Sequence, residues 1–83
     1  MSDLAYTRHA LGRMVKRQIP MAWIERVIAE PDIVEDDEFD PELQHRLGKV
    51  PELANRVLRV IVTKNNPMRV VTLHLDRRMK GKI

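Results

Sequence analysis

Five prolines divide this 83-residue chain into segments that are too short for any long helix. They are Pro20, Pro31, Pro41, Pro51 and Pro67. Proline lacks a backbone N–H and disfavours helical geometry in the residue before it, so each one favours a boundary between elements. A chain of this length has room for one hydrophobic core. We therefore expect residues 1–83 to fold as a single domain of short elements.

The first segments have the periodicity of amphipathic helices. Residues 7–18 place four apolar side chains at helical spacing, namely Ala10, Leu11, Met14 and Val15. Thr7 is a good N-cap, and Pro20 ends the run. Residues 20–30 repeat the pattern with Trp23, Ile24, Val27 and Ile28. The sequence therefore predicts two short helices before Pro31.

Beyond position 32 the pattern changes from helical to alternating. A short strand begins at Ile33 and Val34, and residues 43–50 read as a half-exposed strand. Residues 56–63 are rich in β-branched side chains, which indicates a central strand, and residues 68–76 form the last one. We expect an α+β fold with two N-terminal helices packed on one face of a three- or four-stranded antiparallel sheet.

The last two strands define two faces if residues 64–67 form their turn. Thr63 then pairs with Met68, and Arg59 falls opposite Thr72. Alternation with period two gives one continuous apolar face for the helices to cover, made of Leu58, Val60, Val62, Val71, Leu73 and Leu75. The other face carries Val57, Arg59, Ile61, Val70, Thr72, His74 and Asp76.

Composition excludes several classes of protein. The chain has no cysteine, which favours a reducing cytoplasm over secretion, and no apolar run long enough for a membrane span. Tyr6, Trp23 and Phe39 are its only aromatic residues, too few for a platform that stacks RNA bases. The three histidines are far apart in sequence and match no zinc motif, so we expect neither a metal nor another cofactor.

Charge is distributed unevenly along the chain. Residues 35–42 contain six acids and no base, whereas the rest of the chain carries 15 Lys and Arg against six Asp and Glu. A strongly basic body suits a polyanionic partner such as RNA. The acidic segment reads as a solvated loop, or as an internal mimic of that partner that covers the basic surface.

One cationic stripe lies on the first predicted helix. His9, Arg13 and Arg17 are four residues apart, with Lys16 beside them, and residues 8–19 contain no acid. Three arrangements suit such a stripe: it binds an external anion, it pairs with the acidic loop, or it is simply solvated. The first predicts that Arg13, Lys16 and Arg17 bind nucleic acid.

Arg59, His74, Asp76 and Arg77 form a second constellation, on the face of the sheet that the helices do not cover. Imidazole can transfer protons near neutral pH, and guanidinium binds phosphate with two N–H groups. Metal-free cleavage of RNA needs these groups, so His74 and Arg59, together with His9 of the first helix, are candidate catalytic residues. The simpler interpretation makes His74 a strand residue whose ring is satisfied by a neighbour, and pairs Asp76 with Arg77, Arg78 or Arg59. Further candidates for binding nucleic acid are Arg46, Arg77 and Arg78.

The chain resembles a widespread bacterial family of small uncharacterised domains. The likeness rests on the run Tyr6-Thr7-Arg8-His9-Ala10 followed by Arg13, Met14, Arg17 and Ile19, which matches the pattern Y-[ST]-x-H-A-x-x-R-M-x-x-R-x-I. The order of elements, with Pro31-Asp32, the acidic loop, Arg56-Val57-Leu58 and a late Arg77-Arg78, is also similar to the BrnT toxins and more distantly to the RelE/ParE toxins.

The likeness to toxins implies a metal-independent endoribonuclease of a toxin–antitoxin pair, with RNA as substrate and a cognate antitoxin as partner. The residues it carries over are His9, Arg13, Arg17, Arg59 and Arg77. The chain departs from the RelE pattern because it lacks a full basic site assisted by tyrosine. The alternative is a non-catalytic domain that binds nucleic acid or another protein through the same surface. The sequence does not determine the oligomeric state.

Overall fold

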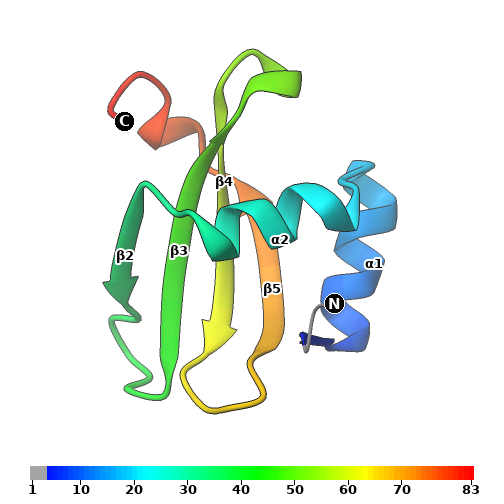
Figure 1. Ribbon diagram of the computed structural model, residues 1–83, viewed down its shortest axis with the longest axis vertical. Coiled ribbons are helices and arrows are strands. Elements are labelled where there is room, and N and C mark those ends of the chain that lie inside the picture. The colour runs from blue at the N-terminus through cyan, green and yellow to red at the C-terminus, as the bar shows by residue number, and fades with distance from the viewer. Residues whose placement is uncertain (1–3) are drawn as a thin grey trace.

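The computed structural model describes residues 4–83 and has the expected α+β fold (Figure 1). Its helices are α1 (Arg8–Arg17) and α2 (Met21–Ala29). Its strands are β1 (Ala5–Tyr6), β2 (Ile33–Asp36), β3 (Leu43–Val50), β4 (Arg56–Thr63) and β5 (Arg69–Leu75). Two short 3-10 turns, η1 (Pro51–Leu53) and η2 (Arg77–Met79), follow β3 and β5. Both helices and the four longer strands lie where the sequence predicts them.

The sheet has five strands in the order β1-β5-β4-β3-β2 and is mixed. β1 pairs in parallel with β5, and the other pairs are antiparallel. The expectation of three or four antiparallel strands is therefore wrong. The additional strand is only two residues long, and so short a segment cannot show an alternating pattern.

The ends of the helices follow from their cap residues. The hydroxyl of Thr7 accepts a hydrogen bond from the N–H of Ala10 at 3.0 Å, which begins α1 as expected. Gln18 ends α1 in the left-handed conformation, with φ of 56°. Pro20 then caps α2 with extended backbone. The chain thus reverses between the helices within a few residues.

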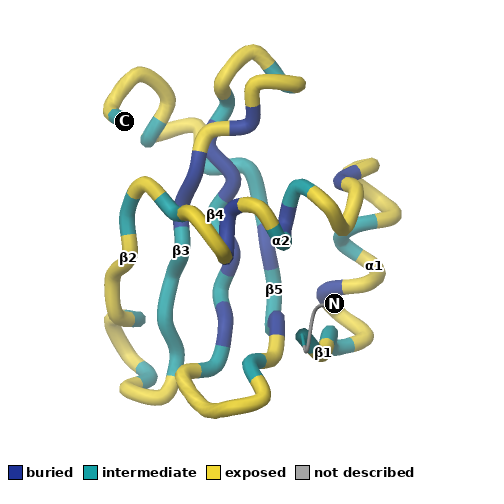
Figure 2. The backbone as a smooth tube through the Cα atoms, viewed as in Figure 1, coloured by how far each residue is buried: buried dark blue, intermediate teal, exposed yellow. Residues whose placement is uncertain are grey.

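Helix α2 lies across one face of the sheet, in front of β3 and β4 in Figure 1. Ile24, Val27 and Ile28 are its buried residues. A side chain at Gly48 of β3 would place its Cβ 3.1 Å from a methyl carbon of Val27, so this glycine allows the helix to approach closely. Most of the buried residues lie on α2, in the second half of β3, along β4, and at Val70 and Leu73 of β5 (Figure 2).

Helix α1 packs beside β5 at the margin of the same core (Figure 1). Ala10 is fully buried and Met14 is partly buried against the core, whereas Leu11 is 43% exposed and Val15 is 80% exposed. Only Ala10 and Met14 of the expected apolar stripe of α1 therefore pack against the core. A helix at the margin of a sheet has a narrower buried side than one lying across it, and here that side includes Thr7 and Arg13, which bond to β5.

The register of the last hairpin differs from the expected one. Arg59 pairs with His74, not with Thr72, and Thr63 does not pair with Met68. A β-bulge lies between the pairs Ile61–Thr72 and Val62–Val70, so Val71 is the extra residue. Val70 is consequently fully buried in the core in the place expected for Val71.

Within residues 4–83, no helix is long and apolar enough to cross a membrane.

Candidate nucleic-acid interface

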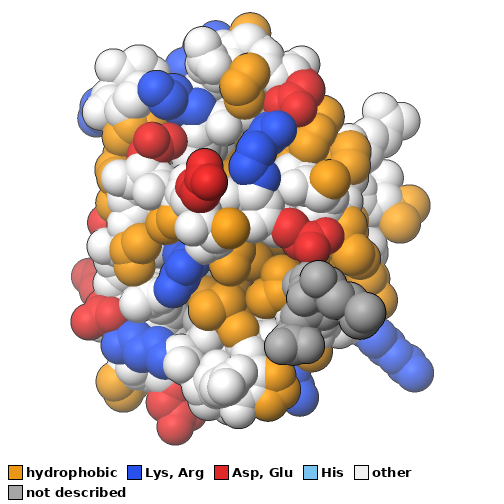
Figure 3. Space-filling view, in the orientation of Figure 1, with side chains coloured by type: hydrophobic (Ala, Val, Ile, Leu, Met, Phe, Trp, Pro, Cys, Tyr) orange, Lys and Arg blue, Asp and Glu red, His pale blue; other side chains and the backbone are white. Residues whose placement is uncertain are grey.

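The face of the sheet away from α2 brings the polar residues together. Cross-strand pairing places Leu47, Arg59 and His74 in one row across β3, β4 and β5. The next row holds His45, Ile61 and Thr72. Figure 3 shows the α2 side, where acidic, basic and apolar side chains are interspersed and no histidine among the described residues is visible. We call the opposite surface the open face.

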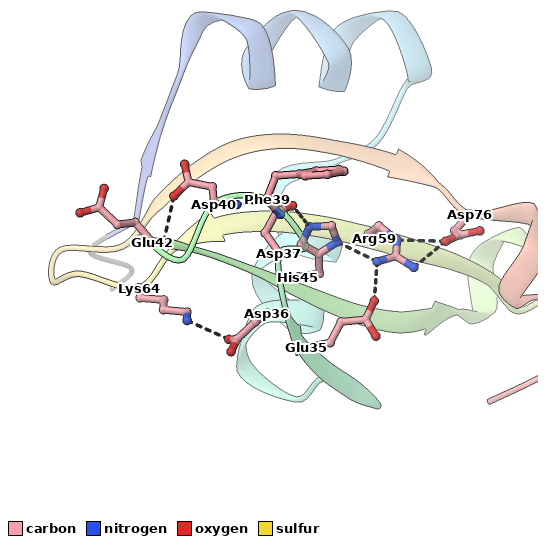
Figure 4. A network of polar contacts seen from close by, with 10 residues as sticks. All are labelled: Glu35, Asp36, Asp37, Phe39, Asp40, Glu42, His45, Arg59, Lys64 and Asp76. Atoms are coloured by element: carbon pink, nitrogen blue, oxygen red, sulfur yellow. Dashed lines mark hydrogen bonds and ion pairs between the residues drawn. The ribbon is translucent and has the colours of Figure 1, made fainter.

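Arg59 lies at the centre of a network on the open face (Figure 4). Its Nε donates to Asp76 at 2.9 Å, and its Nη2 lies 2.8 Å from the same carboxylate. Its Nη1 donates to Glu35 at 2.8 Å and to Nδ1 of His45 at 2.7 Å. The guanidinium is therefore held by two carboxylates and one imidazole, and the expected ion pair of Asp76 forms with Arg59.

The contact with Arg59 determines which ring nitrogen of His45 accepts and which donates. Guanidinium can only donate, so Nδ1 of His45 must accept. Its other nitrogen, Nε2, then carries the hydrogen and donates to Asp37 at 2.6 Å. This bond, with backbone N–H groups of Asp40 and Phe39, lowers the pKa of the Asp37 carboxyl. The acidic loop is thereby attached to the open face.

The acidic residues 35–42 contact groups on β3, on β4 and in the turn after β4, and not on α1. Asp36 pairs with Lys64 at 2.8 Å, while Glu35 and Asp37 hold Arg59 and His45. Among residues 4–83, the basic side chains of α1 form no ion pair with this loop. Of the arrangements considered for the stripe, pairing with the acidic loop is therefore excluded. The loop instead covers part of the open face.

The other half of the open face is built along β5 by α1. Nε2 of His9 lies 2.9 Å from the hydroxyl of Thr72, so His9 faces the sheet. Nε of Arg13 donates to the carbonyl of Leu73 at 3.1 Å. His74 follows and points to the same face as Thr72, about 6–7 Å further along the strand. His9, Arg13 and His74 thus lie along the same stretch of β5, and we call them the β5 cluster.

The surroundings of His74 favour its neutral form. Partial burial lowers the pKa of the ring, and the guanidinium groups of Arg59 and Arg13 lower it further against an opposing effect of Asp76. A neutral imidazole near neutral pH can accept a proton. The ring has no hydrogen-bond partner among the described residues, so the interpretation that a neighbour satisfies it finds no support.

The remaining predicted residues fall into two groups. Lys16, Arg17, Arg77 and Arg78 are exposed, and their side chains form no ion pair within residues 4–83. Arg46 instead shares the α2 side with Val60, and its Nη1 donates to the carbonyl of Ile28 at 2.7 Å. That contact satisfies a backbone carbonyl at the C-terminal end of α2. Arg46 therefore lies on a different side of the sheet from the residues of the open face.

Sequence reasoning missed three members of the network on the open face. They are Glu35, Asp37 and His45. The alternation of residues 43–50 does place His45 on one side with Leu43 and Leu47, but nothing in it relates that side to Arg59. The two acids belong to a uniformly acidic run in which no residue stands out. No group of residues suited to hold a metal ion is present within residues 4–83.

A comparison with protein families gives one match. Residues 6–74 match the family model described as a domain of unknown function, DUF4258. No curated protein and no solved structure matches the chain. The match confirms the expected likeness to a family of small uncharacterised domains, while the likeness to BrnT and RelE toxins stays a prediction.

Proposed function

We propose that this chain, which belongs to the DUF4258 family, is a toxin-like module that cleaves RNA without a metal ion. The observation that carries the proposal is the β5 cluster. Two imidazoles, His9 and His74, and the guanidinium of Arg13 lie along the same strand. His9 contacts the hydroxyl of Thr72 and Arg13 contacts the carbonyl of Leu73, so both are held beside the residues that precede His74 in β5.

The cluster contains the groups that cleavage of RNA requires. In the proposed reaction, neutral His74 takes the proton of the 2′-hydroxyl, and the 2′-oxygen attacks the adjacent phosphorus. His9 gives a proton to the 5′-oxygen as its bond to phosphorus breaks. Arg13 stabilises the negative charge on the phosphorane between them. The products are a 2′,3′-cyclic phosphate and a free 5′-hydroxyl.

Arg59 has a different role from the expected one. Its guanidinium is occupied by Asp76 and Glu35, so it does not serve as the main group that contacts phosphate. It lies directly opposite His74 and helps to keep the pKa of that ring low. We therefore assign Arg59 as a positioning residue, and Arg13 as the residue that contacts phosphate.

The exposed cations supply binding energy for a polyanion. Lys16 and Arg17 lie on α1, and Arg77 and Arg78 follow β5. Contacts of this kind bind the phosphate backbone without reading sequence. The same uncompensated surface suits a cognate antitoxin that covers it with acidic side chains.

Incubation of the purified chain with a labelled RNA in EDTA tests the proposal. We expect cleavage products that end in a 2′,3′-cyclic phosphate. His74→Gln should lower the rate by about 100-fold or more, because general acid–base catalysis contributes about 10²–10⁴-fold. The matched control is His45→Gln, which changes the same residue type on the same face and should lower the rate by less than tenfold.

A second function, binding of RNA without cleavage, is favoured by the carboxylates that occupy Arg59. Binding that weakens steeply with salt, in the absence of any product, would support it. Equal cleavage by wild type and His74→Gln would reject the assignment of His74.

A further inference from the structure

A second basic site lies where β4 begins and β5 ends. A pocket there is lined by Arg56, Leu75, Asp76, Arg77 and Lys80. Arg56 opens β4, and the other four residues span the end of β5 and the turn η2. The N–H of Asp76 donates to the carbonyl of Val57 at 2.8 Å, which holds the two strand ends together. Three of the five lining residues are cationic.

The one acid in this pocket is already neutralised. Oδ2 of Asp76 accepts from Arg59, and Oδ1 accepts from the backbone N–H of Arg78 at 3.0 Å. These bonds also lower the pKa of the Asp76 carboxyl, which keeps it ionised. Within residues 4–83, Arg56, Arg77 and Lys80 form no ion pair. Their positive charges are therefore not balanced by the protein.

We propose that this pocket binds a second phosphate group of the RNA strand that passes the β5 cluster. Two guanidinium groups and an ammonium group around one hollow are the side chains that recognise phosphate oxygens. Asp76 connects the two sites, since it lines the pocket and follows His74 by two residues on the way out of β5. The inference rests on RNA as the proposed substrate and adds how the strand is held.

The short turn η2 helps to position the basic residues of this pocket. Asp76 caps η2 through the N–H of Arg78, which fixes the direction in which Arg77 and Lys80 leave the strand. Without that cap, the basic residues after β5 would have no common orientation. Asp76 therefore serves the pocket by positioning cations, while Arg59 offsets its negative charge.

Binding of a non-cleavable 2′-O-methyl oligonucleotide, measured by fluorescence anisotropy, tests the proposal. The double variant Arg56→Gln/Lys80→Gln should raise the Kd by about 10- to 100-fold, the loss expected for hydrogen bonds to charged groups. The matched control Lys49→Gln/Lys64→Gln removes the same charge elsewhere and should raise it by less than threefold. Lys80→Gln alone, at an exposed position, should give an intermediate Kd and guards against misfolding of the double variant.

Two further readouts separate this proposal from the ribonuclease proposal. Oligonucleotides with and without a 5′-phosphate distinguish a terminal phosphate from an internal one. A pocket that takes only a terminal phosphate contributes nothing to binding of the unphosphorylated strand, whereas a pocket for an internal phosphate contributes to binding of both strands. If the double variant binds both oligonucleotides as tightly as the control does, the pocket is not a phosphate site, even where wild type cleaves RNA. If no RNA is cleaved but the double variant still loses binding, the pocket stands and the ribonuclease proposal fails.

Discussion

The two halves of the open face carry similar side chains but balance their charges in different ways. On β3 and β4, His45 and Arg59 are held by Asp37, Glu35 and Asp76. Along β5, His9 and Arg13 contact only a hydroxyl and a backbone carbonyl among the described residues. The type of residue is therefore a poor guide to its role, and the neighbouring carboxylates decide whether a cation is available to a ligand.

The comparison also separates stability from function. Removing one partner of a partly buried ion pair destabilises the fold, because the other charge is left without compensation. The half that contains Arg59 should therefore respond to substitution by unfolding more easily. The half that contains Arg13 should respond by losing activity with its fold intact. The following predictions test this contrast.

The largest effect is expected from Arg13→Ala. Loss of a donor that stabilises negative charge in the transition state lowers rates by about 10²–10³-fold, so cleavage of RNA should fall by that factor in single-turnover assays. The matched control is Arg17→Ala, one helical turn further along α1, which should lower the rate by less than tenfold. An equal loss in both variants would show that the helix attracts RNA only by its overall charge.

The next effect is a loss of stability in Arg59→Met. The side chains of Arg59 and Asp76 are 15% and 12% exposed, so the substitution leaves Asp76 poorly solvated and without its cation. We expect the free energy of unfolding in urea to fall by about 2–4 kcal/mol. Glu35→Gln is the control, since Glu35 is 51% exposed and its pair should contribute less than about 1 kcal/mol. If Arg59→Met is as stable as wild type, the half of the open face around Arg59 does not have the structural role described.

A smaller effect is expected from pH. The pKa of His74 is lowered from its ordinary 6.5, so below 6.5 the unfolded chain binds a proton that the folded protein resists. The stability that neutral His74 contributes is therefore present above pH 6.5 and is lost as pH falls toward its lowered pKa. Urea unfolding at several pH values should show this loss, and His74→Gln should make the profile flatter. A profile unchanged by His74→Gln would contradict the burial of the ring.

The same lowered pKa sharpens the activity prediction. As the pH is lowered, cleavage that needs neutral His74 should begin to decline only below 6.5. If lowering the pH already slows cleavage at values above 6.5, another group acts as the base. Lys64→Gln provides a control because Lys64 lies outside the β5 cluster, and its profile should coincide with that of wild type.

The smallest effect is expected where an ion pair is exposed. Lys64 and Asp36 pair at 2.8 Å, but their side chains are 38% and 70% exposed. Lys64→Ala should change the free energy of unfolding by less than about 0.5 kcal/mol. Comparison with Arg59→Met in the same urea experiment shows whether the burial of an ion pair, and not its number of charges, decides how much stability is lost. A loss above 1 kcal/mol in Lys64→Ala would contradict that explanation.

Much of the fold could be predicted because proline, cap residues and periodicity act locally. Thr7 and Pro20 mark the ends of the helices for reasons contained in a few neighbouring residues. The strand β1 and the bulge at Val71 depend on pairing between distant segments, which a local pattern does not report. A longer turn and the bulge each displace the pairing by one residue, so the partner of Arg59 changes from Thr72 to His74 while its face stays the same.

The candidate site was predictable only in part for the same reason. Alternation placed Arg59 and His74 on one face, and the structure pairs them directly. The position of His9 depends on how α1 is rotated about its axis, and the apolar residues Leu11 and Val15 suggested the wrong side. The contacts of Glu35 and Asp37 depend on the path of a loop, which the charge of that loop does not determine.

The contact between α1 and β5 has a consequence for how the protein forms during synthesis. His9 and Thr72 are 63 residues apart, and β1 can pair only after β5 has been synthesised. A ribosome therefore releases the first helix long before its counterpart emerges, and long-range closure of this kind is slow. Under the proposed function, the β5 cluster is therefore assembled only when the last strand docks, and a partner that captures β5 as it appears would prevent that assembly.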